Sequence, residues 1–180
     1  MLLAGAAAVV LAIAGVIGFL VLRGEDEDPA AGGPVDLREP LTFQEVAATA
    51  PAPCAAGMLP DPEEATCYRL GASAMTVRRL ERLRILGPDA AHGQSGWRLA
   101  LTLTRADAAG FGRMSGQAAA RPDGSPGRRI AMVAGGRVLS APAIQGGPIT
   151  GGDLEISGSR LFTRPYLEDL ARRLSGRRAP

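Results

Sequence analysis

The sequence predicts an α+β domain, with an antiparallel or mixed sheet and two helices, that follows an N-terminal transmembrane helix. Three observations lead to this fold class. An uncharged apolar run opens the chain, several later segments alternate apolar and polar residues with a period of two, and two others repeat apolar residues at helical spacing. The predicted order after the apolar run is strands, helix, strands, helix.

The apolar run covers residues 1–22 and contains no charged side chain. A helix rises 1.5 Å per residue, so this run would span roughly 33 Å, which is enough to cross a bilayer. A cleaved signal peptide is the alternative, but its apolar region should be shorter and end in a small-x-small site, whereas this run ends at Leu22-Arg23. We therefore expect residues 1–23 to form an uncleaved single-pass membrane anchor.

Charge is distributed unevenly after this run. Residues 23–68 hold ten acidic residues and two arginines, while residues 69–180 hold eight acidic residues and eighteen arginines. Within the first part, residues 24–40 are acidic and rich in Pro and Gly, a composition that cannot bury enough apolar surface to fold. We expect this segment to be a linker, residues 41–176 to be the folded domain and residues 177–180 to be a basic tail.

The basic second part suggests an anionic partner such as lipid headgroups, cell-wall polymer or nucleic acid. All twenty basic residues are arginine, however, and together with abundant Ala, Gly and Pro this indicates nucleotide bias rather than selection of individual guanidinium groups. Aromatic residues for base stacking are scarce, with four Phe, two Tyr and one Trp. We expect no nucleic-acid binding, and we keep an adaptor that binds anionic lipid or cell-wall polymer as an alternative function.

Period-two alternation predicts the strands. Residues 41–46 and 80–86 set apolar residues against polar ones, and residues 129–134 form a further apolar segment. The clearest strand is 97–104, whose one face holds Trp97, Leu99, Leu101 and Leu103 and whose other face holds Arg98, Ala100, Thr102 and Thr104. This strand should have one buried face.

Capping residues and apolar spacing predict the two helices. Thr104 and Asp107 resemble a capping box that opens a helix ending near Ala120. Its apolar stripe is Phe111, Met114 and Ala118, although three glycines lower its helix propensity: Gly110, Gly112 and Gly116.

The final helix is marked at both ends. Thr163 can cap its start and Gly176 can end it. Its apolar residues repeat at helical spacing: Leu167, Leu170, Ala171 and Leu174. Glu168 and Asp169 lie in its early turns, and Arg172 and Arg173 lie near its C-terminus, where the helix dipole favours positive charge.

Residues 135–158 resemble strands, yet they contain seven glycines and two prolines. Gly135-Gly136 predicts a two-residue hairpin turn, because glycine reaches positive φ without steric cost. Pro142 should end the second strand of this hairpin, and Leu154 and Ile156 should face inward from a last short strand.

The two cysteines, Cys54 and Cys67, favour a disulfide. Zinc would need four ligands, and the only histidine, His92, lies far along the chain, so we expect no metal and no cofactor. A bond between the cysteines would stabilise the fold by about 3 kcal/mol in the chain-entropy account. Because disulfides persist in oxidising compartments, we expect the domain to be extracytoplasmic. The distribution of positive charge does not support this topology. Arg23 follows the apolar run, and because positive residues favour the cytoplasmic side, it weakly favours a cytoplasmic domain.

Three segments carry a resemblance to a known family: GWRLALTLTRADAAGFGRMSGQAA (96–119), RRIAMVAGGRVLSAPAIQGGPITGGDLEISG (128–158) and LFTRPYLEDLARRL (161–174). They resemble the head subdomain of the first periplasmic domain of SecD/SecDF, the membrane component of bacterial protein export. The family pattern has a Trp-led strand, a helix, an Asp-Gly turn, a V-x-SAP-x-I segment, I-x-GG, an Ile-Ser-Gly and a helix with a Phe-Thr start. The matching positions are Trp97, Gly136, Val138, Ser140, Ala141, Pro142, Ile144, Ile149, Gly151, Gly152, Ile156, Ser157, Gly158, Phe162 and Thr163, and Gly135 occupies the first position of the turn.

This resemblance covers roughly residues 67–175 and departs from the pattern at Gly135, which replaces the aspartate of the turn. It implies a module that contacts exported polypeptide or a translocation or envelope partner at the outer membrane surface. Full export proteins of the family are similar to one another in having many membrane helices with buried charges that couple proton flow to domain movement. With one expected anchor and no charge within it, we expect a binding module that does not itself perform proton-driven transport.

Catalytic candidates are weak. Asp89, His92 and Ser95 lie within one short polar loop, which offers no scaffold to fix the geometry of a triad. Ser115 lacks the strand-turn-helix elbow of a nucleophilic serine. We expect that the chain is not an enzyme.

Residues 143–151 are the candidate peptide-contact loop. The glycines and prolines there exclude a fully paired central strand, so we expect an edge or a mobile loop. Its unpaired backbone could accept an extended chain, with Ile144 and Ile149 as apolar anchors and Gln145 beside them. The alternative is that both isoleucines only hold the loop against the core.

Overall fold

The computed structural model describes residues 33–61, 63, 65–157 and 159–176. The predicted anchor and basic tail lie outside these residues. Within the described ranges, no helix is both long enough and apolar enough to cross a membrane.

The domain is α+β, as predicted, and its strands form one antiparallel sheet. In chain order the elements are β1 (Val35–Pro51), β2 (Leu59–Pro60), β3 (Thr66–Leu86), η1 (Ala90–His92), β4 (Arg98–Leu103), α1 (Arg105–Ala119), η2 (Pro126–Arg128), β5 (Ile130–Ala134), β6 (Arg137–Ser140), β7 (Asp153–Ile156) and α2 (Arg164–Ser175). The elements η1 and η2 are short 3-10 helices.

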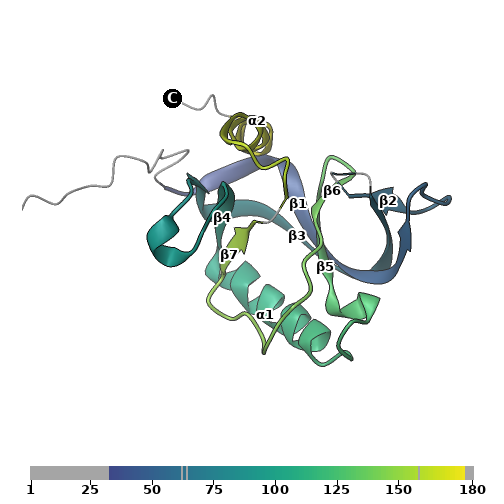
Figure 1. Cartoon of the computed structure of the whole chain (residues 1–180). Coiled ribbons are helices and arrows are strands. Elements are labelled where there is room, and N and C mark those ends of the chain that lie inside the picture. Colours follow the sequence, from purple (N-terminus) through teal and green to yellow (C-terminus); the bar gives the residue numbers. More distant parts are fainter. Residues whose placement is uncertain (1–32, 62, 64, 158, 177–180) are drawn as a thin grey trace, which may run out of the picture.

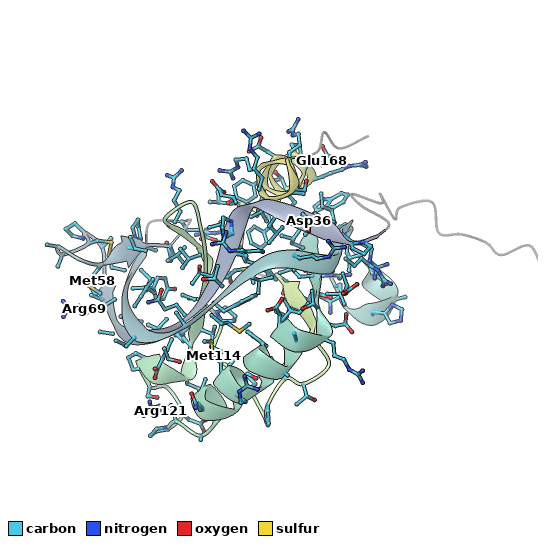
Figure 2. The ribbon with its side chains drawn as sticks, turned by 180° about the vertical axis from the view of Figure 1, so that it is seen from behind. Asp36, Met58, Arg69, Met114, Arg121 and Glu168 are labelled. Carbon is cyan, nitrogen blue, oxygen red and sulfur yellow. A yellow bond between two sulfur atoms is a disulfide. The ribbon has the colours of Figure 1, made fainter. Side chains whose placement is uncertain are left out.

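The long strands β1 and β3 form the centre of a strongly curved sheet. The strand order is β6-β5-β1-β3-β4-β7, and β2 pairs with the outer part of β3. In Figure 1, α2 lies above the strands and α1 lies below them. The view from behind agrees, with α2 above the strands at Glu168 and α1 below them at Met114 (Figure 2). The strands β6 and β7 are therefore the two edges of the main sheet.

Strand β1 begins at Val35, which corrects part of the predicted linker at residues 24–40. Val35 and Leu37 are buried, while Asp36 and Arg38, which alternate with them, are exposed. The composition of the whole segment is that of a linker, but this short alternation at its end is sufficient to pair with β3, where Val35 lies opposite Leu80. The folded domain thus starts before residue 41.

One face of the sheet carries the core. In β4 the predicted alternation is confirmed, because Leu99, Leu101 and Leu103 are buried. They belong to a single apolar cluster with residues of both helices, among them Phe111 and Leu170. The ring of Phe43 on β1 packs edge to face against the ring of Phe111, with 4.9 Å between the ring centroids. This contact joins α1 to the sheet.

The polar face of β4 departs from expectation at Arg98, whose side chain is only 9% exposed. Its Nε lies 2.9 Å from Glu155 Oε1 on β7, and its buried Nη1 has no hydrogen-bond partner among the described residues. Alternation predicted that Arg98 lies opposite the core, and this is correct. Its burial depends on β7, which sequence periodicity could not place beside it.

Both helices have the predicted caps. Thr104 Oγ1 accepts a hydrogen bond from the Asp107 amide at 3.2 Å and donates one to Asp107 Oδ2 at 2.8 Å. Thr163 caps α2 by accepting from the Tyr166 amide, and Gly176 ends it with φ +66°. The helix boundaries therefore follow from local side-chain chemistry.

The Gly135-Gly136 hairpin is also confirmed. It joins β5 to β6, and the two glycines have φ values of +56° and +72°. A Cβ atom at Gly135 would lie 2.8 Å from Glu39 Oε1. An aspartate at this position would bring two carboxylates together, which accounts for glycine where the resembling pattern has an acid.

Candidate interaction surface

The connection between β6 and β7, residues 141–152, crosses the surface of α1 (Figure 1). A Cβ atom at Gly116 would lie 3.5 Å from Pro148, and one at Gly112 would lie 3.5 Å from the carbonyl oxygen of Ile149. Gly112 and Gly116 thus lie beneath the connection, whereas Gly110 faces Met75 on β3.

Ser115 fixes the connection to the helix. Its side chain is fully buried, its Oγ accepts a hydrogen bond from the Ile149 amide at 2.9 Å, and it donates to the Gly112 carbonyl at 3.2 Å. The hydroxyl therefore gives the partly buried N–H of Ile149 a hydrogen-bond partner. This position holds a structural contact between two segments.

Ile144 lies inside the domain, which agrees with the alternative that it holds the loop against the core. Only 4% of it is exposed, its amide donates to the Arg128 carbonyl at 2.9 Å, and its own carbonyl accepts from Arg128 Nε at 2.9 Å. Ile149 is partly buried against the core, and Gln145 is exposed. The count of glycines and prolines identifies a connection, but it does not specify which side chains turn inward.

Gly152 brings the connection into β7. Its φ is +78°, and its carbonyl accepts a hydrogen bond from the Leu103 amide at 2.9 Å. A Cβ atom there would lie 2.8 Å from the Cβ of Ala108 on α1, so only glycine fits. Gly151 beside it has neither constraint, since its φ is not positive and a Cβ atom there would meet nothing within 4 Å.

The register of β7 leaves two of its residues with outward backbone groups. The bond from the Leu103 amide to the Gly152 carbonyl makes this a hydrogen-bonded pair, and the pairs two residues further, Leu101 with Leu154 and Leu99 with Ile156, are of the same kind. The intervening residues of β7 are Asp153 and Glu155. Their N–H and C=O groups consequently point away from β4, along the free edge of the sheet.

An apolar pocket of about 130 Å³ lies beside this edge. It is bordered by core residues of the sheet and α1, by the start and middle of the connection, and by all of β7: Phe43, Phe111, Ile130, Met132, Ser140, Pro142, Ile144, Ile149, Asp153, Leu154, Glu155 and Ile156. The connection and the edge strand thus meet at one pocket. Five positions of the predicted contact loop and motif contribute to it: Ser140, Pro142, Ile144, Ile149 and Ile156.

A polar groove of about 310 Å³ lies on the opposite face of the same edge. Arg82 and Arg84 from β3 border it together with Thr102, whose Oγ1 donates to Asp153 Oδ1 at 2.8 Å. The side chain of Glu155 points to this face as well, where it meets Arg98. A strand beside β7 would therefore find an apolar pocket on one face and charged groups on the other.

The disulfide predicted between Cys54 and Cys67 is present, with a Cα–Cα distance of 5.4 Å. It closes the loop that carries β2, and Glu63 in this loop binds the segment before α2. Glu63 accepts hydrogen bonds from the Arg160 amide at 3.0 Å, from the Arg160 guanidinium at 3.1 Å and from the Ser159 hydroxyl at 3.1 Å. These donors, with the Arg160 amide the largest contribution, lower the pKa of Glu63 below its ordinary value.

This loop borders a second groove, of about 380 Å³, between β6 and α2. Its lining mixes charged and apolar side chains, including Glu39, Asp61, Arg137, Leu139, Leu161 and Tyr166. Leu161 is the large apolar residue that stands out on the described surface, with 41% of it exposed. We call this the β6–α2 groove.

The catalytic candidates form local contacts. Asp89 caps η1, and its Oδ2 lies 2.7 Å from His92 Nδ1, a hydrogen bond that lowers the pKa of Asp89 below its ordinary value. Ser95 is exposed, and no hydrogen bond joins it to this pair in the described part of the chain. Among the described residues, no group of three or more His, Cys, Asp or Glu side chains could hold a metal ion.

The motif positions have identifiable places in the fold. Trp97 is half-buried against the core, and the Arg164 guanidinium lies 5.6 Å from its ring centroid. Ser140 and Pro142 border the apolar pocket, and Gly158 lies outside the described residues. Sequence reasoning identified the connection but missed the outward backbone of β7. The alternation of acids in Asp153-Leu-Glu155 marks a strand with one polar face, but the outward direction of its backbone groups depends on pairing with β4.

Comparison with known proteins identifies the family. The model of the SecDF P1 head subdomain matches residues 72–176, and the chain belongs to this family. A solved structure, described as the crystal structure of SecDF in the super-membrane-facing form, is 25% identical, with a TM-score of 0.46 over 69% of this chain. The match spans 17% of that SecDF chain. No curated protein matches. The described domain thus corresponds to the head subdomain of this family.

We expect Gly152→Ala to lower the free energy of unfolding by about 2 kcal/mol or more, because it combines a positive φ with a clash against Ala108. The matched change Gly151→Ala should alter stability by less than about 0.5 kcal/mol. Urea unfolding followed by Trp97 fluorescence measures both variants. Equal effects of the two substitutions would show that the close approach of Gly152 to α1 is not a constraint.

Proposed function

We propose that the chain is a membrane-anchored, extracytoplasmic binding module of protein export. In this proposal the domain contacts exported polypeptide or a partner in the translocation machinery or envelope, it has no catalytic activity, and it does not itself perform proton-driven transport. The observation that carries the proposal is the family match over residues 72–176. This chain shares only the head subdomain with SecDF. We therefore propose for it only a role in contacting other proteins.

The disulfide supports the compartment. The bond joins Cys54, on an exposed loop after β1, to Cys67, a buried residue near the start of β3. Such bonds persist in oxidising compartments and are rare in the cytosol. An extracytoplasmic domain next to an apolar N-terminal run is therefore consistent with a single-pass protein.

The alternative adaptor for anionic lipid or cell-wall polymer is less favoured. Ion pairs accompany many of the described arginines: Arg79–Asp36, Arg98–Glu155, Arg121–Glu45, Arg128–Asp123, Arg160–Glu63, Arg164–Glu168 and Arg172–Asp169. Carboxylates interleaved in this way reduce the attraction of the surface for a polyanion. Liposome pelleting that depends steeply on salt would favour the adaptor over the export module.

The topology has a direct test. If the domain faces the outside, protease added to intact cells should remove it, and thiol reagents should label Cys54 and Cys67 only after reduction. A domain protected from protease in intact cells, with both cysteines labelled without reductant, would place it in the cytoplasm and contradict the proposal.

The contact with polypeptide is tested by photo-crosslinking in cells. A photoreactive residue at the exposed Gln145, beside the apolar pocket, should capture exported chains or translocation components. The matched control is Arg172 on α2, which is exposed and lies on another element. Adducts at Gln145 that equal those at Arg172, or are absent, would remove the support for this side of the domain as the contact surface.

A further inference from the structure

The free edge of β7 has the features of a site for an extended chain. The outward N–H and C=O groups of Asp153 and Glu155 form no hydrogen bond within the described residues, and they are spaced two residues apart as in a paired strand. A strand laid antiparallel or parallel along this edge would satisfy them. Only an extended backbone presents donors and acceptors at this spacing, so the geometry selects a polypeptide over a small molecule.

The two faces of the edge specify what the side chains of such a strand should be. Successive side chains of a strand point to opposite faces. One face of β7 opens on the apolar pocket of about 130 Å³, which has room for one aliphatic side chain, and the other opens on the polar groove. An incoming segment would therefore alternate apolar and polar residues.

Charge indicates which polar residues fit. The carboxylates of Asp153 and Glu155 would lie directly opposite the polar side chains of the incoming strand, and opposite charges in this position stabilise a strand pair. Asp153 is exposed, and the partner of its carboxylate is the neutral hydroxyl of Thr102. A basic residue in the incoming segment would form a favourable electrostatic interaction with this carboxylate.

The same charges disfavour a second copy of this chain as the occupant. Two β7 strands paired antiparallel about Leu154 would place Asp153 of each opposite Glu155 of the other. Like charges directly opposite destabilise a strand pair. The β6–α2 groove is a weaker candidate, because β2 lies beside the β6 edge and limits the space for another strand (Figure 1).

We propose that β7 is a docking strand for an extended polypeptide segment that alternates aliphatic and basic residues, with one aliphatic side chain entering the apolar pocket. This inference rests on the proposed contact with polypeptide and specifies its site and its substrate class. The connection 141–152 forms one wall of the pocket, which explains why the predicted contact loop borders the site although Ile144 itself is buried.

The test uses the full chain in detergent micelles and a fluorescent nine-residue peptide that alternates valine and lysine. Glu155→Pro removes an outward N–H that β4 does not use and blocks the edge, since proline is tolerated on edge strands in this orientation. Glu155→Ala removes the same carboxylate and its ion pair with Arg98 but keeps the N–H. Anisotropy should show that Glu155→Pro weakens peptide binding roughly tenfold or more, whereas Glu155→Ala changes it less than about threefold.

A second measurement leaves the protein unchanged. N-methylation of alternate amides on the side of the peptide that faces β7 should abolish binding, while methylation of the other alternate set should not. A peptide of the same composition with its valines and lysines in two blocks should bind more weakly. Equal loss in Glu155→Pro and Glu155→Ala, equal binding of both methylated peptides, or self-association through β7 that excludes the peptide would each overturn the proposal.

Failure of this site is distinguishable from failure of the proposed function. If exported chains still crosslink at Gln145 in cells that carry Glu155→Pro, and the purified protein shows no edge-specific binding, the export contact stands and β7 is not its site. If both the crosslinks and peptide binding at the edge are lost in Glu155→Pro alone, the two proposals are supported together.

Discussion

The hydrogen bond from the Ile149 amide to Ser115 Oγ joins the β6–β7 connection to the helix that it crosses. Without it, a partly buried N–H would lose its protein partner. The contact requires a small residue at Gly112, and it delivers the chain to Gly152, where the backbone turns between α1 and β4. The register of β7 is set at that point, so the direction of every backbone group on this edge follows from how the connection is held against α1.

An edge strand with free backbone groups can pair with an identical edge and aggregate, and it can also bind a partner strand. Natural proteins protect such edges by keeping them short and by placing charges on them. Strand β7 has four residues, and two of them are acidic. The same acids that oppose pairing with an identical edge would favour a segment that carries basic residues. Protection against self-association and selection of a partner are thus compatible in one short strand. At the other edge, the disulfide-closed loop and the Glu63 contacts place β2 beside β6.

Local chemistry made much of the fold predictable. The cap at Thr104 and the Gly135 turn depend on interactions within a few residues, so the sequence pattern identifies them. The start of β1 at Val35 was not predictable from composition, because pairing with a distant strand overrides the linker-like average. Nor was the burial of Ile144, which depends on Arg128 sixteen residues earlier. The free edge of β7 follows only from its register with β4, a tertiary property that no local pattern specifies.

Amide hydrogen exchange along β7 tests the central claim most directly. If the register is set as described, the amides of Leu154 and Ile156 bond to β4 and should exchange at least about tenfold more slowly than those of Asp153 and Glu155, which point outward. Addition of the alternating valine-lysine peptide should then slow the second pair selectively. Equal protection of all four amides in the free protein, or fast exchange at Leu154 and Ile156, would contradict the account.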